Sequence, residues 1–469
     1  MISLEQETRS RMIESSQKGR GAARTRRAKR GGPRKRQQGV ALIIAITTIA
    51  ILGALLADMH QSTTTGYVVA TTQRDSLRAE YMAKSGLNLT RLLVSLEPPI
   101  RQLVAPLYRQ LAGRSPPQIP VWRYANLVLQ PFCQHETFDE HGESNIDFRS
   151  SEGLEDLPGT CDIVAFAENS MININRPLML AGDEAKLSLA MQLFSLLGGY
   201  QSPSPYDELF GVVDSQGLLN TRQDVISAII DWWDEDTDQL SFDPGAGAVS
   251  TVGSELDVYR RFKDPYAIKN APLDSLEELR LIRGIDDDFW ATFIEPEPDN
   301  PESRSVTIYG SGLVNPNEAP PEVLLARVCS FVPMSTLCVD PMQGAMFISL
   351  LRTVRSLIPV PFFTRANDFI NFIEGKGNTR DLYPMLSSYL GAESGMIFLP
   401  IEIPQNIRGE MARSFVTSAQ ILTIEATGSV NRAKTKLRTV MNFHDRWTPP
   451  PPLTGTMPGL GIFHYYRVE

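Results

Sequence analysis

Val40 to Ala57 forms an uncharged, mainly apolar run of eighteen residues. As a helix that rises about 1.5 Å per residue, the run spans about 27 Å, enough to cross the hydrocarbon core of a membrane. Twelve Lys and Arg residues but only three Glu precede it, in residues 1–39. Because Lys and Arg flank membrane helices on the cytoplasmic side, the sequence predicts a cytoplasmic N-terminus and a body across the membrane.

The body of the chain is strongly acidic. The formal net charge is −9, and because residues 1–39 carry +9, the remainder carries −18. The basic part has few apolar residues and is expected to be disordered. An acidic body repels phosphates, so we expect no nucleic-acid partner. The sequence contains no HExxH, GxSxG or Walker-type motif, so we expect no enzymatic activity.

Two ordinary interpretations of the apolar run are incomplete. A cleaved secretory signal has a shorter apolar core, of about 7–15 residues, and Leu55 stands where its cleavage site needs a small residue. A plain signal anchor leaves the following sequence unexplained. The helical pattern continues from Met59 to Leu96 without a proline, and Pro98 is expected to end it. The sequence predicts one helix of more than fifty residues, whose amphipathic second half must pack against another structure.

The junction at Gly39 resembles the class III signal of type IV pilins and type II secretion pseudopilins, in which a basic segment meets a long apolar helix. The resemblance implies that the prepilin peptidase cuts between Gly39 and Val40, that the new N-terminus is methylated, and that the helix is retained. Most such subunits carry Glu at the fifth position after the cut, where it neutralises the terminal amine of the next subunit. Here that position holds Ile44, a departure characteristic of the K-type minor pseudopilin and expected at the tip of a fibre.

The body should contain a small antiparallel sheet split by a long insertion. Candidate strands are Leu127–Leu129, Cys161–Ala167 and Met171–Ile174, and a hairpin is expected from Phe415–Gly428 and Leu437–Phe443. Roughly 220 residues separate the two halves and are mainly helical in pattern. Such an insertion also resembles the K-type family.

The insertion contains a repeated sequence motif. MININRPL at Met171 and LVNPNEAPPEVL at Leu313 both give Asn-x-Asn, a proline and a helical pattern, which predicts Asn175 and Asn317 as N-cap or turn residues. In the K-type family this signature introduces each of two small helical domains. The order IIDWWDEDTD, SELDVYRR, NAPL and SLEEL also resembles that family. ELRLIRGI is similar to a helix-hairpin-helix element, but Asp286–Asp288 follows it and excludes DNA.

The predicted fold class is α+β: a pilin-like N-terminal helix packed on a small antiparallel sheet, interrupted by two small helical domains similar to SAM and helix-hairpin-helix domains. The expected divisions are a cleaved leader 1–39, a transmembrane half-helix 40–57, a periplasmic half-helix 58–97, a first sheet part 98–175, helical domains 176–310 and 311–400, C-terminal strands 401–446, and a Pro/Gly-rich tail 447–469. The tail is expected to be extended and mobile, and its aromatic end IFHYYRVE could dock on the protein itself or on a partner.

The acidic stretch Asp234–Asp238, which holds four carboxylates in five residues, is the candidate metal site. Carboxylates this dense repel one another unless water or a cation intervenes, and calcium prefers six to eight oxygen ligands. The spacing is not that of an EF-hand, and a solvated acidic loop is the alternative. The K-type family binds calcium in its helical domain, and the resemblance maps that site here. The candidate ligands are Asp234, Asp236, Asp238, Glu255 and Asp257.

The four cysteines fall in two sequence-local pairs whose spacings do not suit zinc. In an oxidising compartment, the expected disulfides are Cys133–Cys161 and Cys329–Cys338. Four buried free thiols are the alternative.

The resemblance implies a non-enzymatic assembly protein of the bacterial inner membrane, with its body in the periplasm. It would cap the pseudopilus of a type II secretion system and help start its assembly. Implied partners are other minor and major pseudopilins, the prepilin peptidase, the inner-membrane assembly platform, and the membrane itself through Val40–Ala57. The alternatives are a minor pilin or adhesin of a type IV pilus, and an unrelated single-pass periplasmic binding protein.

Overall fold

The computed structural model has two compact units, Met1–Ala70 and Thr71–Glu469, which are taken separately. It describes residues 38–113, 115–134, 136–138, 144–147, 159–176, 182–213, 217–298, 300–357, 361–377, 398–443 and 460–469. The predictions for the basic leader before Gln38 and for the proline-rich part of the tail, 447–459, lie outside the described residues.

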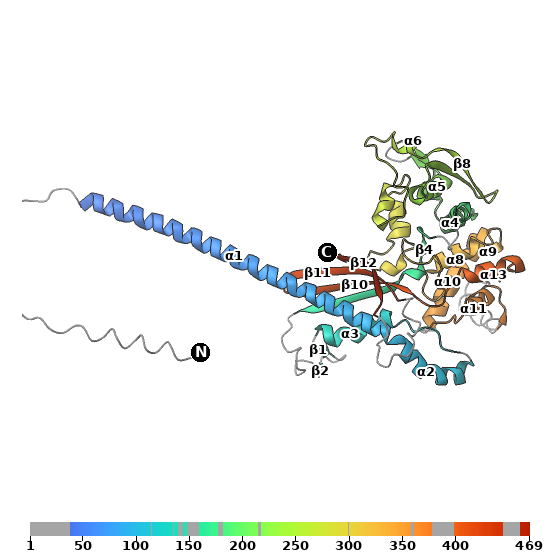
Figure 1. Ribbon diagram of the computed structural model, residues 1–469, viewed down its shortest axis with the longest axis horizontal. Helices are drawn as coiled ribbons and strands as arrows, with labels where there is room; N and C mark the ends of the chain where they lie inside the picture. The colour runs from blue at the N-terminus through green and yellow to red at the C-terminus, as the bar shows by residue number, and fades with distance from the viewer. Residues whose placement is uncertain are drawn as a thin grey trace, which may run out of the picture. The chain divides into compact units, whose positions relative to one another are not determined.

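The first unit contains the start of helix α1 (Gln38–Ser95) (Figure 1). Its side chains from Val40 to Ala70 are exposed, including the apolar ones. The hydroxyls of Thr47 and Thr48 donate to the carbonyl of Ile44 at 3.0 and 2.9 Å, so these polar groups in an apolar stretch are bonded within the helix. By length and composition this helix can cross a membrane.

In the second unit, the later part of α1 packs on a four-stranded antiparallel sheet with strand order β12-β11-β10-β3 (Figure 1). The strands are β3 (Thr160–Ala167), β10 (Ile421–Val430), β11 (Ala433–Asn442) and β12 (Ile462–Val468). β3 therefore pairs with a strand more than 250 residues away in the sequence. This long-range pairing confirms a helix on a split antiparallel sheet.

The helix and the sheet approach closely at Gly428. A Cβ atom at this position would lie 1.9 Å from the backbone carbonyl oxygen of Ala79 in α1, so only glycine allows the contact. Ala79 and Ala83 are fully buried at this crossing, and Ile163 packs against Gly86 of the helix. Small residues on α1 thus bring its backbone down onto the strands, and the amphipathic half of the helix finds the partner it requires.

One predicted strand near the start of the body is wrong. Leu127–Leu129 is not a strand but part of helix α3 (Ala125–Gln134). Ala125, Leu129 and Cys133 are buried at steps of four residues, whereas Leu127 is exposed, which is the period of a helix with one covered face.

The predicted long helix does end just before Pro98, but helical structure resumes at once. Helix α1 ends at Ser95, and helix α2 (Glu97–Ala112) begins at once with prolines in its first turn. Proline is tolerated there because the first N–H groups of a helix have no intrahelical acceptor. Of Met171–Ile174, only Ile172–Asn173 is a strand, β4, and it pairs in parallel with β9 (Val306–Thr307) instead of joining the main sheet.

The region between β4 and β10 is mainly helical. Its main helices are α4 (Asp183–Leu196), α5 (Arg222–Trp233), α8 (Pro321–Cys329), α10 (Pro341–Leu357), α11 (Ala366–Ile373) and α13 (Gln405–Arg413). Shorter helices are α6 (Leu256–Tyr259), η5 (Leu276–Leu281), α7 (Asp287–Phe289), η6 (Trp290–Ile294) and α9 (Thr336–Val339). Small antiparallel pairs in this region are β5 (Val212–Val213) with β6 (Leu219–Asn220), and β7 (Asp238–Asp243) with β8 (Ala248–Ser254). A further pair, β1 (Glu136–Phe138) with β2 (Ser144–Asp147), precedes β3 in the chain.

This region consists of two runs, each closed by parallel backbone pairing. We call residues 176–305 the first helical segment and residues 315–414 the second. Ile172 donates to the carbonyl of Ser305 at 2.9 Å, so the first segment ends beside its own beginning. Val314 donates to the carbonyl of Ser414 at 3.1 Å and closes the second in the same way. The second segment includes α13, although strands were expected from residue 401 onward.

The repeated Asn-x-Asn motif corresponds to a repeated set of side-chain hydrogen bonds, which we call a clamp. The amide of Asn175 donates to the carbonyl of Leu273 and accepts from its N–H, both at 2.9 Å. Asn317 makes the same pair of bonds to Phe363, at 2.8 and 2.9 Å. Neither Asn is an N-cap, since Gly182 precedes α4 and Pro320 precedes α8. Each Asn instead ties the entrance of its segment to a backbone position far along the chain.

Candidate metal centre

The acidic stretch follows helix α5 in the first helical segment. A capping box between Thr221 and Asp224 starts this helix, and its inner face buries Ile226, Ile229 and Ile230. Asp231 lies on the same covered helix, in its last turn. The chain then passes through Asp234 at the helix end and the hairpin of β7 and β8, which returns to Glu255.

Three of these carboxylates meet in the interior. Asp231, Asp234 and Glu255 each place an oxygen within 4.8 Å of the others. The three side chains are almost wholly buried, at 4%, 4% and 1% exposed. Coulomb repulsion between three close negative charges is severe where water is excluded, so the arrangement calls for protons or a cation.

Burial dominates the electrostatics of the cluster. It raises the pKa of Asp231 to about 8, against the hydrogen bond that Leu240 donates to this carboxylate at 2.9 Å. Burial, with repulsion from Asp234, raises the pKa of Glu255 to about 7. The pKa of Asp234 is also raised, mainly by burial and in spite of a bond to Lys186. Within the part of the chain that the structure describes, burial thus outweighs the nearby positive charge at each of the three carboxylates.

Several buried oxygens of the cluster accept no hydrogen bond from any described residue. They are Asp234 Oδ1, Glu255 Oε1 and Asn270 Oδ1. Asn270 is held in the left-handed region, with φ of 47°, and its amide nitrogen donates to Glu255 Oε2 at 3.1 Å and to the carbonyl of Asp236. Carboxylate and amide oxygens without donors are the ligands that a hard divalent cation such as calcium prefers. The donor set fits such an ion.

One cation of the chain itself borders the cluster. The ammonium of Lys186, from α4, lies 2.7 Å from Asp234 Oδ2 and 2.6 Å from Asp236 Oδ2. Only 12% of its side chain is exposed. Lys186 therefore neutralises part of the acidic stretch. Asp231 and Glu255 form no ion pair within 4 Å among the described residues, and only the longer-range charges of Arg283 and Lys186 favour their ionised forms.

The five predicted ligands separate into two groups. The structure brings Asp234 and Glu255 together. Asp236 is 47% exposed and bonds Lys186 and the N–H of Asp238, and Asp238 and Asp257 are themselves exposed. These three lie outside the triad.

Sequence reasoning missed Asp231 and Asn270. The signal for Asp231 was present, because a carboxylate inside the apolar run IIDWW is costly unless it is bound. Asn270 has no comparable signal, since its role depends on a left-handed turn fifteen residues after Glu255.

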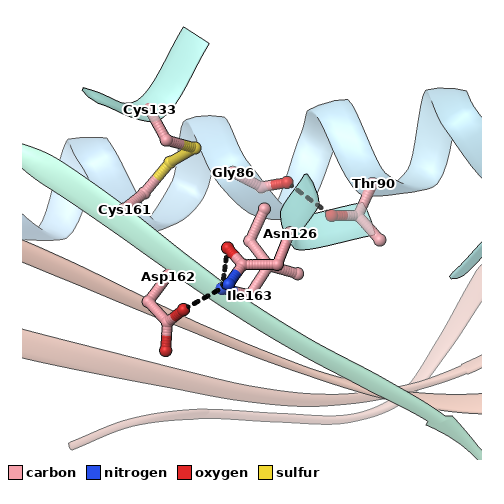
Figure 2. The surroundings of a disulfide bond; sticks show 7 residues. All are labelled: Gly86, Thr90, Asn126, Cys133, Cys161, Asp162 and Ile163. Atoms are coloured by element: carbon pink, nitrogen blue, oxygen red, sulfur yellow. Dashed lines mark hydrogen bonds between the residues drawn. A yellow bond between two sulfur atoms is a disulfide. The ribbon is translucent and has the colours of Figure 1, made fainter. Parts of the chain in front are cut away.

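Both cysteine pairs are joined in the structure. Cys133–Cys161 links α3 to β3 beside helix α1, and Figure 2 shows it next to Asn126. Cys329–Cys338 links α8 to α9 in the second helical segment. No cysteine is free.

Comparison with known proteins places the acidic cluster within a recognised family domain. Residues 199–294 match the family model "Type II secretion system (T2SS), protein K", in its first domain. The match covers about a fifth of the chain, so within this range the chain is similar to protein K of type II secretion systems. The matched range includes α5, the β7–β8 hairpin and all three members of the acidic triad.

A solved structure is also similar to this chain. It is the GspK–GspI–GspJ complex from the type 2 secretion system of enterotoxigenic Escherichia coli. The sequence identity is 12% and the TM-score 0.39, over 78% of this chain and 96% of that chain. Comparison with curated proteins gives no match.

Proposed function

We propose that the protein is the minor pseudopilin that caps the tip of a type II secretion pseudopilus and helps to start its assembly for export across the outer membrane. The observation that carries the proposal is the combination of a protein K domain with a long apolar N-terminal helix that lacks a carboxylate at Ile44. A subunit without that carboxylate cannot neutralise the terminal amine of a subunit ahead of it. Its place is therefore the end of the fibre.

Assembly on this proposal follows from the N-terminal helix. The prepilin peptidase cuts between Gly39 and Val40, and the mature chain starts in the inner membrane, with residues 1–39 cytoplasmic before cleavage and the body in the periplasm. Helix α1 packs against the helices of other minor and major pseudopilins at the assembly platform. The two helical segments add bulk that a subunit inside a fibre has no room for, which supports the same terminal position.

The location can be tested by labelling. Gold-labelled antibody against the second helical segment should mark pseudopili at one end. The mature N-terminus, read by mass spectrometry, should be Val40. Labels spaced along the fibre, or a mature chain that retains its leader, would contradict the proposal, and labels on retractile type IV pili would favour the minor-pilin alternative.

We further propose that the acidic cluster binds calcium through Asp231, Asp234 and Glu255, with Asn270 as a neutral oxygen ligand. Calcium supplies two positive charges at the buried carboxylates and accepts coordination from the oxygens that lack donors. The ion would tie the end of α5 to the residue that follows β8, and so stabilise the first helical segment.

Calorimetry on the detergent-solubilised full chain tests the metal proposal. We expect wild type to bind one calcium ion, and Asp234→Asn to bind it on the order of a hundredfold more weakly, because a buried carboxylate ligand is lost. The matched control is Asp257→Asn, which removes an exposed carboxylate outside the triad and should leave the affinity unchanged. Wild type that binds no calcium, or equal losses in both variants, would exclude this site.

A further inference from the structure

The two edges of the four-stranded sheet are built differently. At the β3 edge, helix α3 lies alongside the strand, and the Cys133–Cys161 disulfide fixes it there (Figure 2). The Asn126 amide accepts from the N–H of Ile163 at 3.3 Å and donates to Asp162 at 2.7 Å. A side chain thus occupies the outward hydrogen-bonding position of the strand. This edge is closed to another strand.

The opposite edge is the strand β12, which among the described residues pairs with β11 alone. Lys436 and Glu469 exchange both backbone hydrogen bonds, at 2.9 and 2.8 Å. Because bonded and non-bonded pairs alternate in an antiparallel ladder, Arg467 and Tyr465 also bond inward to β11. Tyr466 and Val468 therefore direct their N–H and C=O groups outward, where no described residue pairs with them.

β12 carries few of the devices by which proteins protect an edge strand, although its pairing with β11 has one irregularity in register, at Val440–Met441. It contains no proline and no lysine, and its only Lys or Arg residue, Arg467, lies 3.1 Å from Glu469. Its apolar side chains are substantially exposed, at 40% for Phe463, 44% for Tyr466 and 46% for Val468. The strand offers both a row of main-chain donors and acceptors and apolar side chains beside that row.

The strand is nevertheless held in a fixed register. The guanidinium of Arg91, on α1, donates to the carbonyl of Leu460 at 2.9 Å and lies 4.8 Å from the ring centre of Phe463. On the opposite face of the sheet, the rings of Tyr465 and Tyr309 are 6.3 Å apart. These contacts fix β12 from both faces but leave its outer edge uncovered among the described residues, so the edge is preorganised.

We propose that β12 is a docking site for an extended segment of a partner pseudopilin, which adds to the sheet as a fifth strand. An alternating row of N–H and C=O groups is complemented along its length only by an extended main chain. The added strand would carry apolar residues at alternate positions, to pack beside Phe463 and Tyr466. The inference rests on the proposed function, in which the neighbours of this chain at the fibre tip are other pseudopilins.

A matched pair of variants isolates the outward N–H group. Tyr466→Ala and Tyr466→Pro both remove the ring, but only the proline variant also removes the outward donor. Neither changes the inward bonds of Tyr465 and Arg467 to β11. We expect the purified partner minor pseudopilins of the same secretion system to bind the full chain at least tenfold more weakly with Tyr466→Pro than with Tyr466→Ala, by surface plasmon resonance. Thermal unfolding of both variants checks that the sheet is intact.

The outcomes separate the two proposals. Equal affinity of the two variants, with wild type binding its partners, overturns the strand-addition site and leaves the proposed function standing. Wild type that binds none of the other pseudopilins overturns the proposed function itself. A photo-crosslinking amino acid in place of Tyr466 should join a partner subunit, and a crosslink to a second copy of this chain would contradict the assignment of the occupant.

Discussion

The two helical segments begin with the same kind of asparagine clamp but differ in which side chains they bury. In each, an asparagine clamps a distant backbone position, Leu273 in the first and Phe363 in the second. Aromatic rings pack in both, with the ring centres of Trp232 and Tyr259 6.0 Å apart in the first segment and those of Phe363 and Phe369 5.1 Å apart in the second. Past the clamp, the first segment also buries three carboxylates together, whereas the second carries a disulfide.

The comparison shows that two segments with similar entrances and similar aromatic packing differ in whether they bury an acidic cluster. The aromatic packing and the disulfide of the second segment do not require a bound cation. The first segment buries like charges that cost free energy unless a cation is bound, so its stability depends on the surroundings. We therefore expect the two segments to respond to different reagents.

The largest expected effect is calcium removal. At a calcium concentration about a thousandfold above the Kd, the ion contributes about 4 kcal/mol to the free energy of unfolding. EDTA should increase amide hydrogen exchange in the first segment, around α5 and Glu255, while exchange in α8 and α10 stays the same. Equal increases in both segments would mean that they unfold as one unit.

Removal of the second disulfide should have the reverse distribution. The Cys329–Cys338 bond closes a short loop, with a sequence separation of 9, so replacing both cysteines by serine should cost about 3 kcal/mol. Hydrogen exchange should rise in α8 and α9. Calcium affinity is the control, and a weaker affinity in this variant would contradict the independence of the segments.

The shared clamp should contribute similarly in the two segments. Asn175→Ala and Asn317→Ala each leave a backbone N–H and a carbonyl without their partner, which should cost about 2 kcal/mol in each case. Chemical denaturation in saturating calcium measures both losses. If one substitution proves neutral and the other severe, the two clamps are not equivalent.

Lys186→Met gives the smallest expected effect. It should lower the stability of the calcium-free protein but raise its affinity for calcium. Without calcium, the variant should unfold at a lower temperature, because Asp234 and Asp236 lose their positive partner. Calcium affinity should rise on the order of tenfold, because a competing positive charge is gone. A variant that loses both stability and calcium affinity would show instead that Lys186 organises the site.

The sequence predicted the features that follow a period or a pairing rule. The apolar run from Val40, the hairpin of β10 and β11 and the far-off partner strand at Cys161–Ala167 all have strong local patterns. Leu127–Leu129 was wrong because three apolar residues fit either period, and only burial at four-residue steps decides between them.

The candidate site was predictable only in part, for a different reason. Density of charge in the sequence pointed to the exposed Asp236 and Asp238, whereas the buried triad depends on where a hairpin returns the chain. Asp231 could have been found, as a lone charge on a covered helix. Asn270 and the C-terminal strand β12 could not, because their roles depend on turns and tertiary pairing that no local pattern encodes.

The closed ends of the helical segments have a mechanical consequence. A pull along the chain through Ile172 or Val314 reaches a hydrogen-bonded neighbour, Ser305 or Ser414, before it reaches any helix of the inserted segment. Load applied to the sheet can therefore pass across these short pairings and bypass the helices. The helical segments would then carry little of the load. They could change conformation around a bound ion while the strands carry the tension.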